Sequence, residues 1–252
     1  MNIVIIGAGY VGMATAKLLK DLYPVLIDKN SKLVDQLNHG QHPICTKHGF
    51  DFKGFATTDF AVAKDAKYAF ICIPTPLQHE RLDCEGVANC INELKALNPE
   101  INIVVRSTVS MGFCEYHGVS FMPEFLTEAD PFQQTRLIFG GQTCDDDFHT
   151  LLKSNEYQVT SSTEAELIKL GLNAYLSMRL AYFWNIKNIT EKIEGDFDAV
   201  LAGICGDKRI GQDYADPPFL IRGKCLPKDL SEFAYSTNHS FFYEILKQSQ
   251  VM

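Results

Sequence analysis

Cys225 is the residue with the clearest chemical potential, and it lies in the segment Gly-Lys-Cys-Leu-Pro-Lys-Asp at residues 223–229. Pro227 suits the first turn of a helix, so Cys225 is predicted to sit just before a helix N-terminus. The positive helix end and the flanking Lys224 and Lys228 favour a thiolate, which predicts a reactive nucleophile. A buried, unreactive cysteine beside a helix start is the alternative on these residues alone.

Lys169 and Asn173 form a second candidate pair, because residues four apart share one face of a predicted helix. Their neighbours are apolar, so a lysine there costs free energy unless it is paired or used in chemistry. Its ammonium could stabilise a developing negative oxygen. The alternatives are that Lys169 extends to the surface or pairs with Glu166.

The segment Gly7-Ala8-Gly9-Tyr10-Val11-Gly12 follows an apolar run and opens a helical pattern, the context of a dinucleotide-binding loop. Gly7 makes the tight turn, Gly9 admits a pyrophosphate to the backbone, and Gly12 allows close helix packing. Asp28 ends the next apolar run, where a carboxylate accepts ribose hydroxyls and repels a 2′-phosphate. This pattern favours NAD over NADP; FAD and a plain glycine turn are the alternatives.

The elements that must position these residues are short apolar strands alternating with helices, which predicts an α/β fold with a Rossmann-like, doubly wound parallel sheet. Predicted strands are 2–7, 24–28, 68–74, 101–107, 119–123 and 136–141, and predicted helices are 10–21, 31–39 and 86–97. We expect an NAD-binding domain over 1–160 and a helical dimerisation and catalytic-cysteine domain over 161–252.

The second domain is predicted to start with a long central helix from about 163 to 193. Its middle is apolar nearly all round, so we expect it to pack against a second copy in a homodimer. The following segment is predicted to be a loop punctuated by Gly and Pro, and short helices are expected near 227–236 and 239–249.

Composition narrows the function classes. The chain has 252 residues, 46% hydrophobic and 21% charged, with a net charge of −8, as in a globular protein. This balance argues against nucleic acid or an anionic membrane as the main partner. The eight cysteines include no Cys-x-x-Cys pair and no zinc-like spacing, so we expect reduced thiols, no metal and a cytoplasmic location. We expect no targeting segment and no membrane span.

With these motifs in place, the chain resembles the UDP-glucose/GDP-mannose dehydrogenase family, and within it the branch that oxidises UDP-glucose at C6. Matching stretches are the glycine loop, IPTP at 73–76, RSTVSMGF at 106–113, MPEFLTEAD at 122–130, EAELIKLGLNAYLSMRLAYF at 164–183, DKRIG at 207–211 and GKCLPKD at 223–229. The resemblance implies oxidation of a nucleotide sugar to the carboxylate with two NAD, for use in polysaccharide biosynthesis.

The resemblance also implies roles for individual residues. Catalytic positions are Cys225, Lys169, Asn173, Asp229, Thr108 and Glu128. Cofactor contacts are Gly7, Gly9, Tyr10, Val11, Gly12, Asp28, Lys32, Thr75, Thr108 and Glu128. Substrate contacts are Glu124, Phe125, Leu126, Lys169, Asn173, Arg209, Tyr214 and Gly223, with Arg209 reaching the partner subunit's site. Cys225 is the implied nucleophile that forms a thiohemiacetal and then a thioester, which water hydrolyses.

Two departures keep other functions open. The family's glycine-rich loop before the cysteine retains only Gly223, and the chain ends at Met252, before the family's UDP-binding domain. The alternatives are a catalytically impaired NAD-binding remnant, an enzyme for a smaller sugar, and an enzyme completed by a separate chain. The segment STVS at 107–110 also resembles short-chain 3-hydroxyacid dehydrogenases, which do not need the Cys225 motif.

Overall fold

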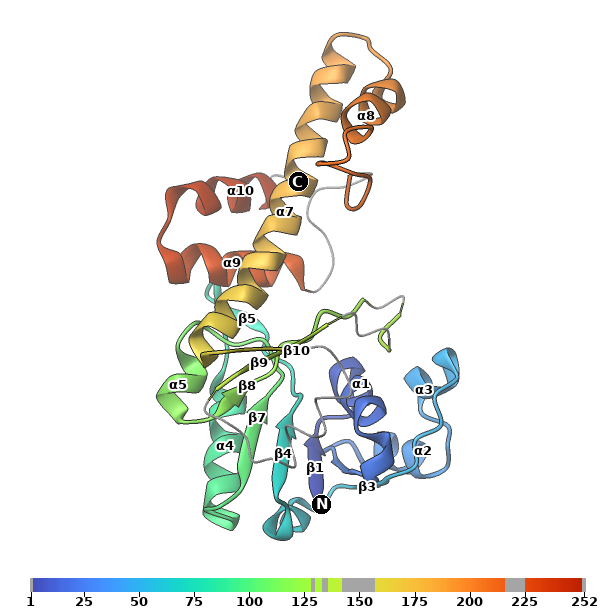
Figure 1. Ribbon diagram of the computed structural model, residues 1–252, viewed down its shortest axis with the longest axis vertical. Helices are drawn as coiled ribbons and strands as arrows, with labels where there is room; N and C mark the ends of the chain where they lie inside the picture. The colour runs from blue at the N-terminus through green and yellow to red at the C-terminus, as the bar shows by residue number, and fades with distance from the viewer. Residues whose placement is uncertain (1, 128–129, 133–135, 142–156, 216–224, 251–252) are drawn as a thin grey trace. The chain divides into compact units, whose positions relative to one another are not determined.

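The computed structural model describes residues 2–127, 130–132, 136–141, 157–215 and 225–250 (Figure 1). The chain divides into two units. The first comprises 1–76 and 83–169, and the second comprises 77–82 and 170–252. A short hairpin from the first half of the sequence therefore belongs to the second unit.

An eight-stranded sheet forms the first unit, with strand order β10-β9-β8-β7-β4-β1-β2-β3. The six predicted strands are confirmed as β1 (Ile3–Ile6), β2 (Val25–Ile27), β4 (Tyr68–Ile71), β7 (Asn102–Val105), β8 (Ser120–Phe121) and β9 (Leu137–Gly140). All pairings are parallel except β8 with β9. Two edge strands, β3 (Phe55–Thr57) and β10 (Tyr157–Thr160), were not predicted, because they are short and partly exposed.

Helices cover both faces of this sheet. Alternate residues of β1 enter two different cores: Ile3 and Ile5 in one, Val4 and Ile6 in the other. The first core includes residues of α1 (Tyr10–Leu18), α2 (Ser31–Asn38) and α3 (Pro43–His48). The second includes residues of α4 (Glu85–Leu97), α5 (Phe113–His117) and the start of α7 (Ser162–Lys192). Burial on both faces explains why the strands are continuously apolar.

The chain order around β1 determines where a ligand can enter. Strand β1 lies between β2 and β4. The chain leaves β1 toward β2 and leaves β4 toward β7, so the connections after the adjacent strands β1 and β4 run to opposite sides. Ligands bind outside the carboxyl ends of the strands at such a switch point. The glycine loop begins there with Gly7, directly after β1.

The second unit is helical. It contains α7 from Leu170 onward, α8 (Phe197–Cys205), α9 (Leu226–Thr237), α10 (Ser240–Gln250) and the hairpin of β5 (Leu77–Gln78) and β6 (Arg81–Leu82). The long helix and both C-terminal helices are confirmed. Helix α8 lies in a segment that was predicted to be a loop, because its apolar sequence has no clear helical period. The Asp196 carboxylate caps the start of this helix by accepting from the Asp198 and Ala199 N–H groups. In the described part, no helix has the length and apolar character to cross a membrane.

Candidate functional site

The glycine loop has the geometry of an anion cradle. Gly7 has φ +103°, and a Cβ there would lie 2.6 Å from the Cys72 carbonyl oxygen. A Cβ on Gly12 would lie 1.8 Å from the Gly7 oxygen, so neither position accepts a side chain. Gly9 faces open space at the N-terminus of α1, and no side chain caps this helix. The N–H groups of its first turn are therefore available to a pyrophosphate.

Asp28 holds this loop from the carboxyl end of β2. Its Oδ2 accepts the Ala8 N–H at 2.7 Å, and its Oδ1 accepts the Asn30 N–H at 2.9 Å. Each oxygen keeps a lone pair for a ribose hydroxyl. From the other side, the Nε2 of His42 lies 3.0 Å from the Ala8 carbonyl oxygen. Burial lowers the pKa of His42, so a neutral ring donates to this carbonyl; no sequence motif marked this residue.

Other expected cofactor contacts lie at the same edge of the sheet. Thr75 follows β4, and its hydroxyl donates to the Thr108 carbonyl oxygen at 2.7 Å, which joins the loops after β4 and β7. Tyr10 is partly exposed in the first turn of α1, as is Lys32 in the first turn of α2. These residues all lie on the connections that follow β1, β2, β4 and β7.

Lys169 is 5% exposed and forms a buried ion pair with Glu124. Its ammonium donates to the Glu124 carbonyl oxygen at 2.7 Å and to Oε1 at 2.9 Å. The Phe125 ring centroid lies 5.6 Å from the Lys169 nitrogen. The Leu126 N–H donates to Glu124 Oε2 at 2.8 Å, so one segment presents all three expected substrate contacts around this lysine.

Both alternatives for Lys169 are wrong. It does not extend to solvent, and its carboxylate partner is not Glu166. Glu166 instead accepts the Gly112 N–H at 2.6 Å and the Cys114 N–H at 2.8 Å, at the start of α5. Burial would raise the pKa of Glu124, but the Lys169 ammonium and the Leu126 N–H hold it below its ordinary value. The Glu124 carboxyl is therefore ionised at neutral pH.

In the second unit, Asp229 joins α9 to α7. This carboxylate is fully buried and accepts from the Asn173 side-chain amide at 2.6 Å and from the Lys228 ammonium at 2.5 Å. Cys225 occupies the N-cap position of α9, as predicted, and it is exposed. The arrangement places an accessible thiol one helical turn before a fixed carboxylate.

The remaining described cysteines differ from Cys225. All seven that the structure describes are thiols, and five are buried: Cys45, Cys72, Cys90, Cys114 and Cys205. Burial raises the pKa of Cys45 and Cys72 to about 11 and that of Cys90 to about 12. Such thiols stay protonated at neutral pH and are poor nucleophiles.

Several expected site residues are not brought into these clusters. Arg209 has a side chain 88% exposed and pairs with Asp207 two residues away. Tyr214 is exposed with φ +55°. Glu128 and Gly223 lie outside the described residues.

Glu232 is a buried residue that the sequence analysis missed. It lies on α9, and its carboxylate accepts from Arg81 Nε at 3.1 Å, Arg81 Nη2 at 3.0 Å and the Leu82 N–H at 2.8 Å. The Ser236 hydroxyl also donates to it. Ser231 donates to the Glu80 carbonyl oxygen at 2.7 Å, so the hairpin is fixed to the helix that Cys225 precedes.

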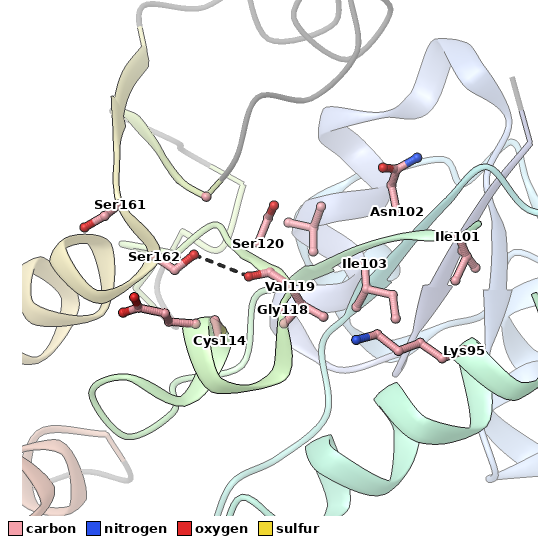
Figure 2. Close-up of a pocket in the computed structure, with 13 residues that line it drawn as sticks. Lys95, Ile101, Asn102, Ile103, Cys114, Gly118, Val119, Ser120, Ser161 and Ser162 are labelled. Atoms are coloured by element: carbon pink, nitrogen blue, oxygen red, sulfur yellow. Dashed lines mark hydrogen bonds between the residues drawn. The ribbon is translucent and has the colours of Figure 1, made fainter. Parts of the chain in front are cut away.

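A cavity of about 500 Å³ lies elsewhere in the first unit, lined by residues around β7, β8 and the start of α7 (Figure 2). Two of its polar side chains donate to nearby backbone: Ser162 Oγ to the Val119 carbonyl oxygen at 3.3 Å, and Lys95 to the His117 carbonyl oxygen at 2.6 Å. None of the expected site residues lines it, so it is not the cofactor site.

Comparison with known proteins connects these features to one family. The model described as the NAD binding domain of the UDP-glucose/GDP-mannose dehydrogenase family matches residues 1–150, and that of its central domain matches 163–251. The first match confirms NAD as the cofactor.

Relatives and solved structures agree with this match. The chain is 30% identical to a UDP-glucose 6-dehydrogenase of Campylobacter jejuni over 100% of its length and 72% of that protein. It is 30% identical to one of Streptococcus pneumoniae, with coverages of 94% and 68%. Its fold is similar to that of a UDP-glucose dehydrogenase from Pyrobaculum islandicum, with a TM-score of 0.85, 21% identity and coverages of 99% and 67%. A GDP-mannose dehydrogenase of Pseudomonas aeruginosa gives a TM-score of 0.74 at 24% identity, with coverages of 99% and 68%.

Proposed function

Because this chain belongs to the UDP-glucose/GDP-mannose dehydrogenase family, we propose that it oxidises the C6 alcohol of a nucleotide sugar to the carboxylate, with UDP-glucose as the substrate. The observation that carries this proposal is the exposed Cys225 thiol at the N-terminus of α9, followed by the buried Asp229. An alcohol dehydrogenase that stops at the aldehyde needs no such thiol, whereas oxidation to an acid through a thioester does.

We propose that Gly7, Gly9, Gly12, Asp28 and Thr75 hold NAD, which supplies the hydride acceptor for both oxidations. The stoichiometry is one sugar alcohol, two NAD and one water, giving one carboxylate, two NADH and three protons. Lys169 acts in the first oxidation, where its ammonium stabilises the negative charge on O6 as the proton leaves to solvent.

Cys225 and Asp229 act in the second half of the reaction. The Cys225 thiolate adds to the aldehyde carbon, and the loss of a second hydride from that carbon leaves a thioester. Water then adds to the thioester carbonyl, the C–S bond breaks, and the thiolate is regenerated. Asn173 and Lys228 hold the Asp229 carboxylate in one orientation, from which it directs the attacking water.

We further propose a homodimer formed through α7. Four exposed apolar residues follow one side of this helix, Tyr175, Tyr182, Ile189 and Ile193, with exposures of 53%, 50%, 54% and 70%. The first three are seven residues apart, the spacing of a helix–helix contact stripe. Packing two such stripes together removes them from water. The exposed Arg209 is the residue assigned to the partner subunit's substrate in this proposal.

Two other functions remain candidates, because the chain spans only 72% and 68% of the first two relatives. One is an enzyme whose substrate site is completed by a separate chain. The other is an NAD-binding protein without turnover. The proposed division into 1–160 and 161–252 assigns cofactor binding to the first domain in every case.

NADH formation with a panel of nucleotide sugars tests the proposal. We expect two NADH per UDP-glucose consumed and a uronate as the product. One NADH per sugar with an aldehyde product would contradict the cysteine mechanism, and NAD binding without NADH formation from any sugar would favour the non-catalytic alternative. Activity that appears only on adding a separate nucleotide-binding domain would favour the two-chain enzyme.

A further inference from the structure

Arg106 is the least satisfied charged group in the described residues. It directly follows β7, is 1% exposed, and none of its three guanidinium nitrogens has a hydrogen-bond partner. A buried cation without a partner carries a desolvation penalty that no opposite charge offsets. An unsatisfied buried group in a folded protein calls for an explanation, and a role in the chemistry of a nearby site is one.

A carboxylate lies on the same side of the sheet edge as Arg106. The Met122 N–H donates to the Val105 carbonyl oxygen at 2.8 Å, so the chain after β8 runs beside the chain after β7. Glu124 lies two residues beyond Met122 in the segment beside Arg106. Burial lowers the pKa of Arg106, while Cys72 and Glu124 favour its charged form. Arg106 and Lys169 are thus two buried cations around one carboxylate, and only Lys169 is bonded to it.

Lys169 is poorly prepared for its proposed role while this bond persists. Two of its three N–H donors go to Glu124, and the carboxylate 2.9 Å away cancels most of its positive charge. Stabilisation of a developing oxyanion requires an uncompensated charge aimed at the oxygen. The reaction therefore needs a place for the Glu124 carboxylate away from Lys169.

We propose that Arg106 is the alternative ion-pair partner of Glu124. The Glu124 carboxylate leaves Lys169 and pairs with the Arg106 guanidinium when Lys169 binds the sugar oxygen. The guanidinium fork matches a carboxylate with two parallel hydrogen bonds, which replace the bonds to Lys169 and the Leu126 N–H. No bond is made or broken covalently, and the total charge of the cluster is unchanged. Arg106 is then a positioning residue that acts through Glu124. The catalytic role of Arg106 rests on the proposed function, whereas the pairing of Glu124 with Arg106 does not.

A folding experiment without ligand tests the pairing. We would measure urea unfolding of Arg106→Met in the parent chain and in a Lys169→Met chain. In the parent, Arg106→Met should change the equilibrium constant for folding by less than threefold or shift it toward the folded state, because the substitution removes no hydrogen bond. In the Lys169→Met chain, Glu124 has Arg106 as its cation, so the same change should lower the folding equilibrium at least tenfold. Adding Glu124→Gln should abolish that difference.

Controls separate this pairing from general destabilisation. Lys95→Met removes another cation of the first unit and should have the same effect in both chains. Lys169→Gln repeats the comparison in a second background that keeps a donor for the Glu124 carbonyl oxygen. Equal effects of Arg106→Met in the parent and both Lys169 variants would overturn the proposal, as would a tenfold loss in the parent itself.

A kinetic readout tests the positioning role separately. Arg106→Met should slow formation of the first NADH in a single turnover at least tenfold while the NAD dissociation constant stays unchanged, and Arg106→Lys should restore part of the rate. An unchanged rate would overturn the catalytic part. If no variant and no parent forms NADH, the proposed function fails, while the unfolding comparison still decides the pairing.

Discussion

Replacing Glu232 by Gln should destabilise the second unit, because this buried carboxylate joins the hairpin to α9. Gln keeps one acceptor oxygen and puts an NH₂ where the other carboxylate oxygen receives donors from Arg81 and Leu82. The guanidinium is half exposed and regains water, but the Leu82 N–H is left buried without an acceptor. At ~1 kcal/mol for each of two lost bonds and ~1–2 kcal/mol for the orphaned donor, the expected cost is about 3–4 kcal/mol.

Urea unfolding at pH 7, followed by far-UV circular dichroism, measures this cost. Glu244→Gln is the matched control: it removes an exposed carboxylate from α10 whose pairing with Lys247 should be worth less than ~1 kcal/mol. A Glu232→Gln effect no larger than the Glu244→Gln effect would refute the structural role of Glu232. Arg81→Met leaves the buried Glu232 carboxylate without its cation, so it should cost at least as much in the parent and less in the Glu232→Gln chain, where that charge is absent.

The pH dependence gives the same prediction a second test. Burial acts to raise the pKa of Glu232, but Arg81, Ser236 and the Leu82 N–H together hold it below its ordinary value. A carboxyl with a depressed folded-state pKa contributes stability that is present above its unfolded pKa and is lost as pH falls through the folded value. The stability difference between the parent and Glu232→Gln should therefore be constant above about pH 5 and narrow below about pH 4. A difference that widens in acid would contradict this assignment.

Three further outcomes are expected. Asp28→Ala should weaken NAD binding by about 1–3 kcal/mol in calorimetry, whereas Asp35→Ala, an exposed carboxylate on α2, should not; equal affinities would refute the role of Asp28. Cys225 should be the first described cysteine alkylated by iodoacetamide in mass spectrometry, and Cys225→Ser should stop acid formation while the first oxidation survives; uronate made by that variant would disprove the thioester. Tyr182→Glu with Ile189→Glu should shift the chain toward monomer in light scattering, and a parent chain that is already monomeric at micromolar concentration would exclude the dimer.

The sequence alone determined the features that depend on neighbouring residues. The central strands were predictable because both of their faces are buried, so each is a continuous apolar run. The glycine loop was predictable because Gly7 and Gly12 meet backbone atoms at distances that no side chain fits. Cys225 was placed before a helix because Pro227 suits a first turn, and α9 begins at Leu226 as expected. Such signals depend on local backbone geometry, which a few consecutive residues specify.

The ion pairs were decided only by tertiary structure. Lys169 had a nearby carboxylate in Glu166, one turn away on the same helix, but it pairs with Glu124, 45 residues away in sequence. Glu232 and Arg81 are 151 residues apart, and neither belongs to a motif. The partner of a buried charge depends on which loops the sheet and helices bring to one place, because desolvation penalises a buried charge that has no opposite charge beside it. Sequence spacing indicates which charges a helix carries; the fold determines which of them meet.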